Sequence, residues 1–540
     1  YLMITEENVP SVRGASQAYG LSFTPGTWVE SIQITKGAGS VVNGYESISG
    51  QINTELIKPI NDIPFFLNAY GSTDSRFELN THFNTQLSQK WSSSLFVHGN
   101  TRVSKMDQNN DGFMDNPLAK QINVMNRYQY YDAEKGLVSF INFRYMNDKK
   151  QSGEVDFDPD RDRGTTNRWG SEINTQRLDL ATKVGYVFKD MPFQSIGFQN
   201  AFTLHDQNSY YGLNVYDIKQ SSFYSNLIFN SIINNTKHKF ATGINFAYDN
   251  YNEFVGLTDY GRVDNSVGTF FEYTYDNDDN FSLVLGGRVD NHNRLGTFVT
   301  PRLHLRYNPW EKSVLRFSAG RGKRAANIFA ENQSLFASSR TFSILDTDGK
   351  IYGLNPEIAW NYGLSFNQKF QLFGRNGDAG FDLYRTDFQN QAVVDVMQSP
   401  QQVLFYNLKG KSYATSLQIE FNYELANRFS LRSAYKYYDI QTQYLSGVYQ
   451  RPLQAKHRFF GNLEYETGRS ESGSQWRFDA TYNWLGKQQL PVTASNPAQD
   501  RLPEFSPSYN LINAQVTHVF SSNFEIYVGG ENIGNYKQSK

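Results

Sequence analysis

The sequence contains no cysteine, which excludes disulfide scaffolds and thiolate metal sites. It has no run of about 18 apolar residues, so no transmembrane helix is predicted. A formal net charge of -2 over 540 residues argues against nucleic-acid binding. The chain also lacks an opening signal peptide, because Tyr1-Leu2-Met3 is not an initiation region. We therefore expect it to begin inside a longer precursor.

Signatures of catalysis are missing as well. The eight histidines are scattered and form no H-x-x-x-H or H-E-x-x-H motif, and no cysteine can complete a zinc site. Neither a G-x-S-x-G elbow nor a P-loop is present. The sequence therefore predicts that the protein is not an enzyme.

Aromatic residues, in contrast, are abundant. The chain has 41 Phe, 35 Tyr and 7 Trp, which together make up 15% of its residues. This richness is typical of the aromatic girdles at membrane interfaces, where a ring is buried and its polar tip stays in water. The mean hydropathy of -0.58 is compatible with a membrane barrel, because half of each strand can be polar.

Apolar and polar residues alternate through much of the chain after residue 60. Arg302 and Arg306 alternate with leucines, and Glu420 lies in a second such series at 417–425. Alternation places the two residue types on opposite faces of a strand. A charge that faces lipid at mid-bilayer costs about 2–4 kcal/mol, so the charged face must line an aqueous interior. We expect Arg302, His304 and Arg306 to touch an N-terminal segment inside a barrel, or an anionic solute.

Short polar turns and long polar stretches alternate between these series, and the long stretches include residues 206–220, 251–264 and 320–356. This pattern is typical of outer-membrane barrels, which have short turns on one side and long loops on the other. We count about 21 candidate strands of the ~10 residues that a tilted crossing needs. Because bacterial single-chain barrels close with an even number of strands, we expect a parent barrel of about 22 strands. The predicted fold is therefore all-β, a transmembrane antiparallel β-barrel that lacks its final strand.

Residues 1–60 differ from the rest of the chain. Glycine and other small residues dominate residues 14–50, and Pro59 and Pro64 follow. We place a domain boundary there, with a barrel domain at 61–540 that is truncated at its C-terminus.

Several motifs resemble those of TonB-dependent outer-membrane receptors. Residues 29–37, 40–44 and 48–53 resemble the end of that family's plug domain, with Gln33 and Asn43 as departures from the usual acidic residue and tyrosine. Two weaker barrel motifs follow in the expected order: Leu354-Asn355-Pro356-Glu357 with Asn361-Tyr362, and Glu531-Asn532-Ile533-Gly534-Asn535-Tyr536. The residues that carry the plug motif are Glu30, Lys36, Gly37, Gly44, Gly50 and Asn53.

The resemblance implies a plugged barrel in the outer membrane of a Gram-negative bacterium, with residues 1–60 as the C-terminal part of the plug inside the barrel. It implies TonB-dependent active uptake of a scarce solute, driven through the TonB–ExbB–ExbD system. We expect a metal chelate, such as a ferric siderophore, haem, cobalamin or another metal complex. A passive outer-membrane pore or surface adhesin is the first alternative, and a glycan importer is the second.

One polar stretch has the spacing of a Ca²⁺-binding loop. Gly112 is at the sharp-turn position, but position 12 is Leu118, so the bidentate glutamate is missing. The alternative is a solvated loop of Asx turns. The candidate ligands for a structural Ca²⁺ in this external loop are the side chains of Asp107, Asn109, Asp111 and Asp115 and the carbonyl of Phe113.

The stretch at 320–345 is the best candidate for contact with the transported ligand. It places cations beside aromatic rings, a combination that suits an anionic chelate with apolar parts. The alternative is that this loop only covers the barrel mouth. The predicted ligand-binding residues are Arg321, Lys323, Arg324, Phe329, Phe336 and Arg340.

Overall fold

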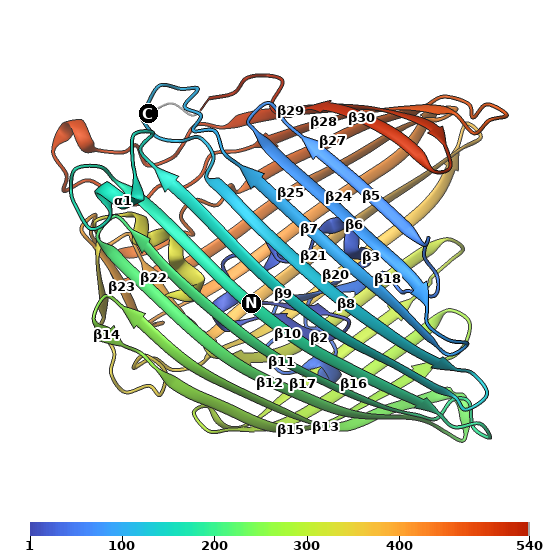
Figure 1. Ribbon diagram of the computed structural model, residues 1–540. Helices are drawn as coiled ribbons and strands as arrows, with labels where there is room; N and C mark the ends of the chain where they lie inside the picture. The colour runs from blue at the N-terminus through green and yellow to red at the C-terminus, as the bar shows by residue number, and fades with distance from the viewer. Residues whose placement is uncertain (538–540) are drawn as a thin grey trace. The chain divides into compact units, whose positions relative to one another are not determined.

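The computed structural model describes residues 1–537 of the chain, and most of them lie in β-strands (Figure 1). The order of the strands in the largest sheet is that of a closed antiparallel barrel. The helical elements of the described residues are short: α1 (Pro159–Asp162), η1 (Gly14–Ser16), η2 (Gly20–Ser22), η3 (Gly26–Trp28), η4 (Val41–Asn43), η5 (Ala330–Ala337) and η6 (Ala498–Asp500). None of the helices among these residues is long and apolar enough to cross a membrane.

Contacts divide the chain into two compact units. Unit 1 comprises Tyr1–Tyr275, Val284–Arg302 and Arg321–Glu357. Unit 2 comprises Asp276–Leu283, Leu303–Gly320 and the chain from Ile358 onward. The N-terminal 60 residues therefore belong to the same unit as the strands that follow them.

Unit 1 begins with a small sheet of its own, which we call the N-terminal sheet. Its strands are β1 (Leu2–Glu6), β2 (Val9–Val12), β3 (Val29–Lys36) and β4 (Gly50–Leu56), in the order β2-β1-β4-β3. β1 and β4 run parallel, while the other two pairs are antiparallel. Gly37 ends β3 with a φ of +83°, a left-handed conformation that glycine adopts without steric cost.

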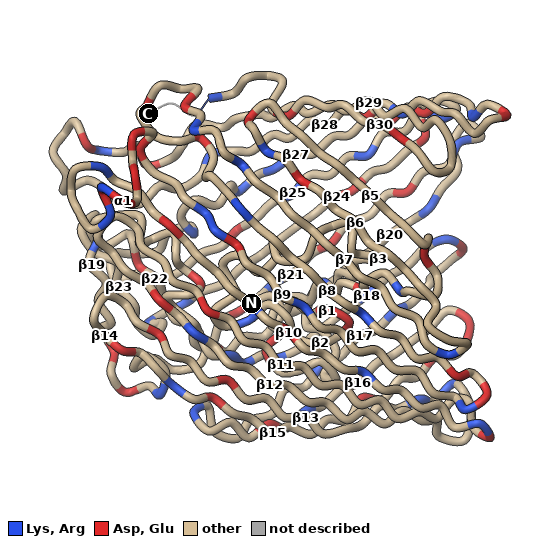
Figure 2. The backbone as a smooth tube through the Cα atoms, in the orientation of Figure 1, with Lys and Arg blue, Asp and Glu red and all other residues tan. Residues whose placement is uncertain are grey.

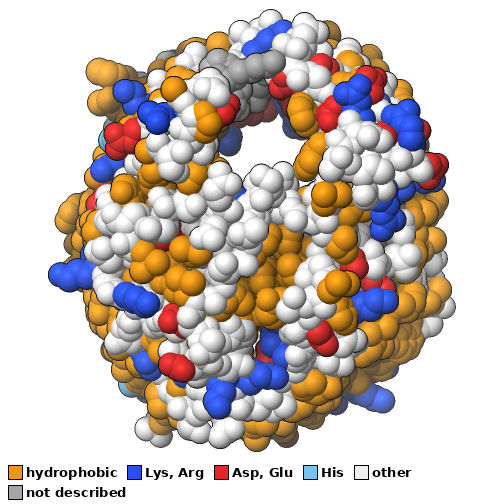
Figure 3. All heavy atoms as spheres, turned by 90° about the vertical axis from the view of Figure 1, so that its left-hand side faces the viewer, with side chains coloured by type: hydrophobic (Ala, Val, Ile, Leu, Met, Phe, Trp, Pro, Cys, Tyr) orange, Lys and Arg blue, Asp and Glu red, His pale blue; other side chains and the backbone are white. Residues whose placement is uncertain are grey.

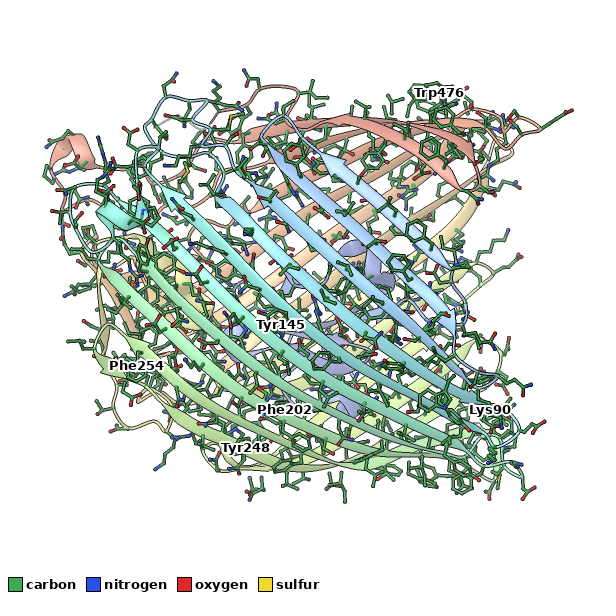
Figure 4. All side chains as sticks on the ribbon, viewed as in Figure 1. Lys90, Tyr145, Phe202, Tyr248, Phe254 and Trp476 are labelled. Atoms are coloured by element: carbon green, nitrogen blue, oxygen red, sulfur yellow. The ribbon has the colours of Figure 1, made fainter. Side chains whose placement is uncertain are left out.

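The wall of unit 1 consists of long strands joined by short turns at one end. Lys90 marks one of these turns in Figure 4. β16 to β18 contribute residues to both units. The strands are β5 (Phe65–Gly71), β6 (Arg76–Gln86), β7 (Trp91–Arg102), β8 (Leu118–Asp132), β9 (Leu137–Gly153), β10 (Gly170–Val187), β11 (Ser195–Tyr211), β12 (Asn214–Ile233), β13 (Asn235–Val255), β14 (Thr258–Asp259), β15 (Arg262–Asp276), β16 (Phe281–His292), β17 (Gly296–Tyr307), β18 (Ser313–Arg324) and the short β19 (Thr341–Ile344).

The strands of unit 2 follow the same antiparallel pattern. β22 and β23 form a hairpin in the connection between β21 and β24. The strands are β20 (Glu357–Leu372), β21 (Arg375–Asn390), β22 (Ala392–Asp395), β23 (Gln402–Asn407), β24 (Ser412–Ala426), β25 (Phe429–Tyr444), β26 (Gly447–Gln450), β27 (His457–Glu466), β28 (Gln475–Leu485), β29 (Tyr509–Ser521) and β30 (Phe524–Gly530).

The strands have one apolar face and one polar face, as the alternation predicts. On β11, Phe198 and Leu204 are exposed while His205 and Gln207 are buried, and Phe202 lies on the same exposed face (Figure 4). In unit 2, Ile419 and Phe421 are exposed on either side of Glu420 in the sequence. Apart from the short β14 and β26, the barrel order of the described residues contains 21 strands, which agrees with the predicted count.

Two of the long stretches predicted as loops are continuations of strands. β11 and β12 run on to a two-residue turn at Gly212, and β13 to β15 fill most of 251–264. The prediction of loops was wrong because the pattern that we took to indicate a strand requires apolar residues on one face. Beyond a membrane, a hairpin needs only its backbone hydrogen bonds and polar cross-strand pairs such as Lys219–Asp206, whose N–O distance is 2.9 Å. Figure 2 shows charged residues in the turns and loops and also along the strands.

Candidate functional site

The N-terminal sheet lies against the polar face of the unit 1 strands and is held there by ion pairs. Glu7, in the turn between β1 and β2, accepts hydrogen bonds from Arg127 of β8 at 3.0 Å and from Lys183 of β10 at 3.1 Å. The backbone N–H of Leu56 donates to the same carboxylate at 2.9 Å. Burial alone would raise the pKa of Glu7, but Arg127, Lys183 and the Leu56 N–H lower that pKa below its ordinary value. Glu7 is therefore a buried, ionised contact between the sheet and the wall.

Further ion pairs and an apolar cluster join the same surfaces. Arg13 pairs with Asp249 of β13, and Arg144 of β9 pairs with Glu6 at 3.4 Å. The Arg144 guanidinium also lies over the ring of Trp28, 5.4 Å from its centroid. The buried cluster beneath it comprises Trp28, Leu56, Phe96 and Met125.

A second part of the N-terminal region, the 39–47 segment, contacts the wall through its backbone. Arg302 of β17 donates to the carbonyls of Gly39 and Ser40 at 2.6 Å each. It also donates to the carbonyls of Gly44 at 3.0 Å and Ser47 at 3.3 Å. The prediction that Arg302 touches the N-terminal segment is thus confirmed. Arg306 lies exposed at the end of β17 and donates to Asn308 at 3.4 Å, and its contact with an anionic solute stays a prediction.

The six plug-motif residues have structural roles within the N-terminal region. Glu30 pairs with Lys58 at 2.9 Å, and Lys36 closes β3 opposite Gly50. Asn53 is buried and accepts hydrogen bonds from Thr5 at 2.8 Å and from the backbone of Asn8 at 2.7 Å. Gly44 has a φ of +134°, and a side chain at Gly50 would come within 2.9 Å of the Thr35 carbonyl.

The predicted ligand loop starts at the end of β18 and contains η5. Arg324 is buried between Glu331 and Glu357, 2.7 Å from the latter, and Lys323 is buried with its ammonium 2.8 Å from the Leu295 carbonyl. Arg321 donates to the Val299 carbonyl at 3.2 Å. Burial lowers the pKa of Arg340. Of the four cations, only Arg321 and Arg340 are partly exposed.

Phe329 and Phe336, the two aromatic residues predicted to bind ligand, are buried in a ring cluster. Phe336 lies 5.0 Å from Tyr216 and 4.6 Å from Phe342 between ring centroids. Phe329 lies 4.9 Å from Tyr260. These rings attach the loop to β12 and to the hairpin that precedes β15, so they support the loop. Figure 3 shows charged and apolar side chains intermixed on the face that it views.

Arg262 of β15 joins both ends of this loop to the wall. Its guanidinium donates to Glu253 at 3.1 Å, to the hydroxyl of Tyr352 at 2.7 Å, and to Asn327. It also pairs with Asp264 at 3.1 Å. No local motif marks Arg262 or Glu253 in the sequence, and their position on the polar face was the only available signal.

A small polar cavity lies between the N-terminal sheet and the polar face. Its volume of about 60 Å³ suits a few water molecules and is too small for a chelate. Charged side chains line it from both sides, among them Arg13, Glu46, Asp249, Asp264 and Arg324.

The candidate Ca²⁺ loop is folded by Asx turns. Asp107 accepts from the backbone of Asp111 at 3.1 Å and of Gly112 at 2.9 Å, and Asp111 accepts from Phe113 at 2.8 Å. Asp115 accepts from the backbone of Gln108 at 2.8 Å. Among residues 1–537, no group of three or more His, Asp or Glu side chains is arranged to hold a metal. The oxygen donors suit Ca²⁺ in kind, and its binding stays a prediction.

The chain belongs to the TonB-dependent receptor-like β-barrel family, whose model matches residues 35–533. This family consists of transporters of the Gram-negative outer membrane, so the protein is an outer-membrane receptor and not an enzyme. The apolar outer face of the strands agrees with this location.

Solved structures share the fold at low sequence identity. FpvA of P. aeruginosa, solved bound to heterologous pyoverdines, is 13% identical with a TM-score of 0.73, over 99% of this chain and 76% of that one. The alcaligin receptor FauA of Bordetella pertussis is 13% identical with a TM-score of 0.69, over 98% and 84%. The siderophore receptor PirA of Acinetobacter baumannii is 11% identical with a TM-score of 0.73, over 99% and 86%. No curated protein matches the sequence.

Proposed function

We propose that this receptor imports a metal chelate, most simply a ferric siderophore, with energy delivered through TonB–ExbB–ExbD. The observation that supports this proposal is that buried ion pairs such as Glu7–Arg127 hold the N-terminal sheet against the polar face. A passive pore has no need of a separate sheet inside its wall. The structural neighbours include FpvA bound to pyoverdines, the alcaligin receptor FauA and the siderophore receptor PirA, which favours a chelate over a glycan.

Growth of a deletion strain tests this proposal when each supplied compound is the only source of the limiting nutrient: iron for the siderophores and haem, cobalamin for cobalamin, and carbon for the glycan. The strain, with and without the restored gene, is supplied in turn with hydroxamate and catecholate ferric siderophores, haem, cobalamin and a glycan. We expect one chelate to restore growth only when TonB is intact. Growth restored without TonB supports the passive pore, and growth that depends on the glycan supports the glycan importer.

Arg321 and Arg340 are the predicted ligand residues that the geometry favours. Both are partly exposed, whereas Lys323, Arg324, Phe329 and Phe336 are buried in support of the loop. Arg321 belongs to β18 and Arg340 to the loop itself, so Arg340 is the residue tested. A lost charge-assisted hydrogen bond weakens binding by about tenfold or more. We therefore expect Arg340→Gln to weaken binding of the identified chelate to whole cells by about that factor. Lys350→Gln, at an exposed cation of the same loop, serves as the control and should leave affinity unchanged.

A further inference from the structure

The N-terminal region is attached to the unit 1 wall in two different ways. Around β2, side chains of the sheet meet side chains of the wall, as in the pair Arg13–Asp249. In the 39–47 segment, backbone carbonyls meet wall donors instead. Besides Arg302, Arg288 of β16 donates to the Val41 carbonyl and Asn226 of β12 to the Val42 carbonyl, each at 3.2 Å.

The wall groups that face β2 keep partners on the wall itself. Asp249 accepts from Ser222 at 2.5 Å and from Gln220 at 2.9 Å, both of β12. Arg177 pairs with Asp179 of the same strand at 2.9 Å, in addition to its bond with the Ser11 carbonyl. If β2 left the wall, these groups would remain hydrogen-bonded.

Arg302 differs because all four of its hydrogen bonds end on the 39–47 segment. The residue is only 3% exposed. Of the nearby carboxylates, Asp290 pairs with Arg288 at 2.7 Å, and Glu272 accepts from Ser40 of the same segment at 2.8 Å. Departure of the segment would break all four charge-assisted hydrogen bonds of Arg302 at once, which is unfavourable.

The 39–47 segment also supports the ligand loop. Tyr45 packs against Leu295, Phe298 and Ile351, and its ring centroid lies 5.1 Å from that of Phe298. The segment thus lies between Arg302 and the base of the ligand loop, which in the structure is the connection between β18 and β20, residues 325–356.

We propose that Arg302 is a positioning residue that keeps the 39–47 segment on the wall throughout the transport cycle, while β2 and the turn after it leave the wall. This inference rests on the proposed TonB-driven uptake. It assigns the fixed part of the N-terminal region to the 39–47 segment, and the moving part to β2 and the turn that carries Arg13.

Paired cysteines test which part moves, because the chain has no cysteine of its own. A Cβ at Gly286 would lie 2.9 Å from the Val41 side chain, so Val41→Cys with Gly286→Cys joins the segment to β16. Val9 of β2 packs in a cluster with Ala201 of β11, so Val9→Cys with Ala201→Cys joins β2 to the wall. Under oxidation, we expect the first pair to retain uptake of the chelate and the second to block it until a reductant is added. Blockage by the first pair, or uptake through the second, would overturn the proposal.

Permeability to a large hydrophilic antibiotic tests Arg302 without any chelate, so a wrong substrate assignment does not affect it. We expect Arg302→Gln to raise sensitivity several-fold in cells with active TonB and to leave it unchanged in cells without TonB. Arg302→Lys should restore part of the wild-type resistance, and Arg306→Gln on the same strand is the matched control. The oxidised Val41→Cys/Gly286→Cys pair should restore resistance to Arg302→Gln, because a covalent bond replaces the hydrogen bonds.

Two outcomes would contradict the role of Arg302. Equal sensitivity with and without TonB would mean that the residue only maintains the fold, and unchanged sensitivity in both would mean that the segment needs no such contact. Surface levels of each variant are measured in parallel. If Arg302→Gln does not reach the membrane, the cysteine pairs in the otherwise unaltered chain decide the question alone.

Discussion

The polar faces of the two units carry similar residues in different environments. In unit 1 the N-terminal sheet covers that face, and the Arg127–Glu7 pair has side-chain exposures of 0% and 5%. In unit 2 the Arg432–Glu464 pair, with a similar N–O distance of 3.0 Å, has exposures of 62% and 31%. Both pairs join an arginine to a glutamate, so burial is the main difference between them.

The difference in burial decides whether a charged side chain contributes to holding the structure together or only interacts with water. A buried ion pair is worth little relative to an apolar replacement, but the loss of one partner leaves the other charge buried and unpaired. An exposed pair is screened by water and contributes little in either case. The charges of unit 1 therefore determine where the N-terminal sheet is seated, whereas those of unit 2 line a wetted surface.

The largest effect is expected from Glu7→Gln. The substitution keeps the side-chain shape but leaves Arg127 buried without its carboxylate, a loss of about 3–5 kcal/mol. Hydrogen exchange of the β1 and β4 amides, followed by mass spectrometry, measures the free energy of opening of the N-terminal sheet. Exchange as slow as in the wild type would show that the pair does not hold the sheet.

The same carboxylate gives a pH dependence. Because the pKa of Glu7 is lower in the folded protein than its ordinary value, the unfolded state binds more protons at acidic pH. The stabilisation that the Glu7 carboxylate gives the folded state is complete above the ordinary glutamate pKa of about 4.3. It is lost as the pH falls through the lower pKa that Glu7 has in the folded protein. The difference in sheet protection between wild type and Glu7→Gln should therefore shrink on acidification. A difference that stays constant with pH would assign the effect to packing.

An intermediate effect is expected from Arg262→Gln, at the base of the ligand loop. The variant loses charge-assisted hydrogen bonds to Glu253 and Tyr352. Glu253 still accepts from the hydroxyls of Tyr216 and Tyr352, so we expect a net loss of about 1.5–3 kcal/mol. Limited proteolysis should then cleave the 325–356 loop several times faster. The N-terminal sheet should keep its exchange protection, and faster exchange there would show that the loop and the sheet open together.

Much of the fold could be predicted from the sequence, because a barrel wall imposes a two-residue period on every strand. Arg302 could be assigned to the polar face in this way, and glycines such as Gly37 showed where the chain must turn. The extent of the hairpins above the membrane could not be predicted, since the pattern loses its apolar face there. This is why residues 206–220 read as a loop.

The candidate ligand site was harder to predict for another physical reason. Composition identified the 320–345 stretch, but it could not separate residues that contact a solute from those that support the loop. Arg324 and Phe336 prove to be buried against Glu357 and Tyr216. Pairings over such sequence separations leave no local signal, and the same holds for Arg262 and Glu253.

The smallest effect is expected from Glu464→Gln in unit 2, the matched counterpart of Glu7→Gln. The chemical change is the same, but Arg432 is 62% exposed and stays hydrated when its partner is neutralised. The free energy of opening of β25 and β27, measured by hydrogen exchange, should change by no more than about 1 kcal/mol. A loss of opening free energy as large as that caused by Glu7→Gln would mean that the polar face of unit 2 is as shielded from water as that of unit 1. Burial by the N-terminal sheet would then not be the cause of the difference between the units.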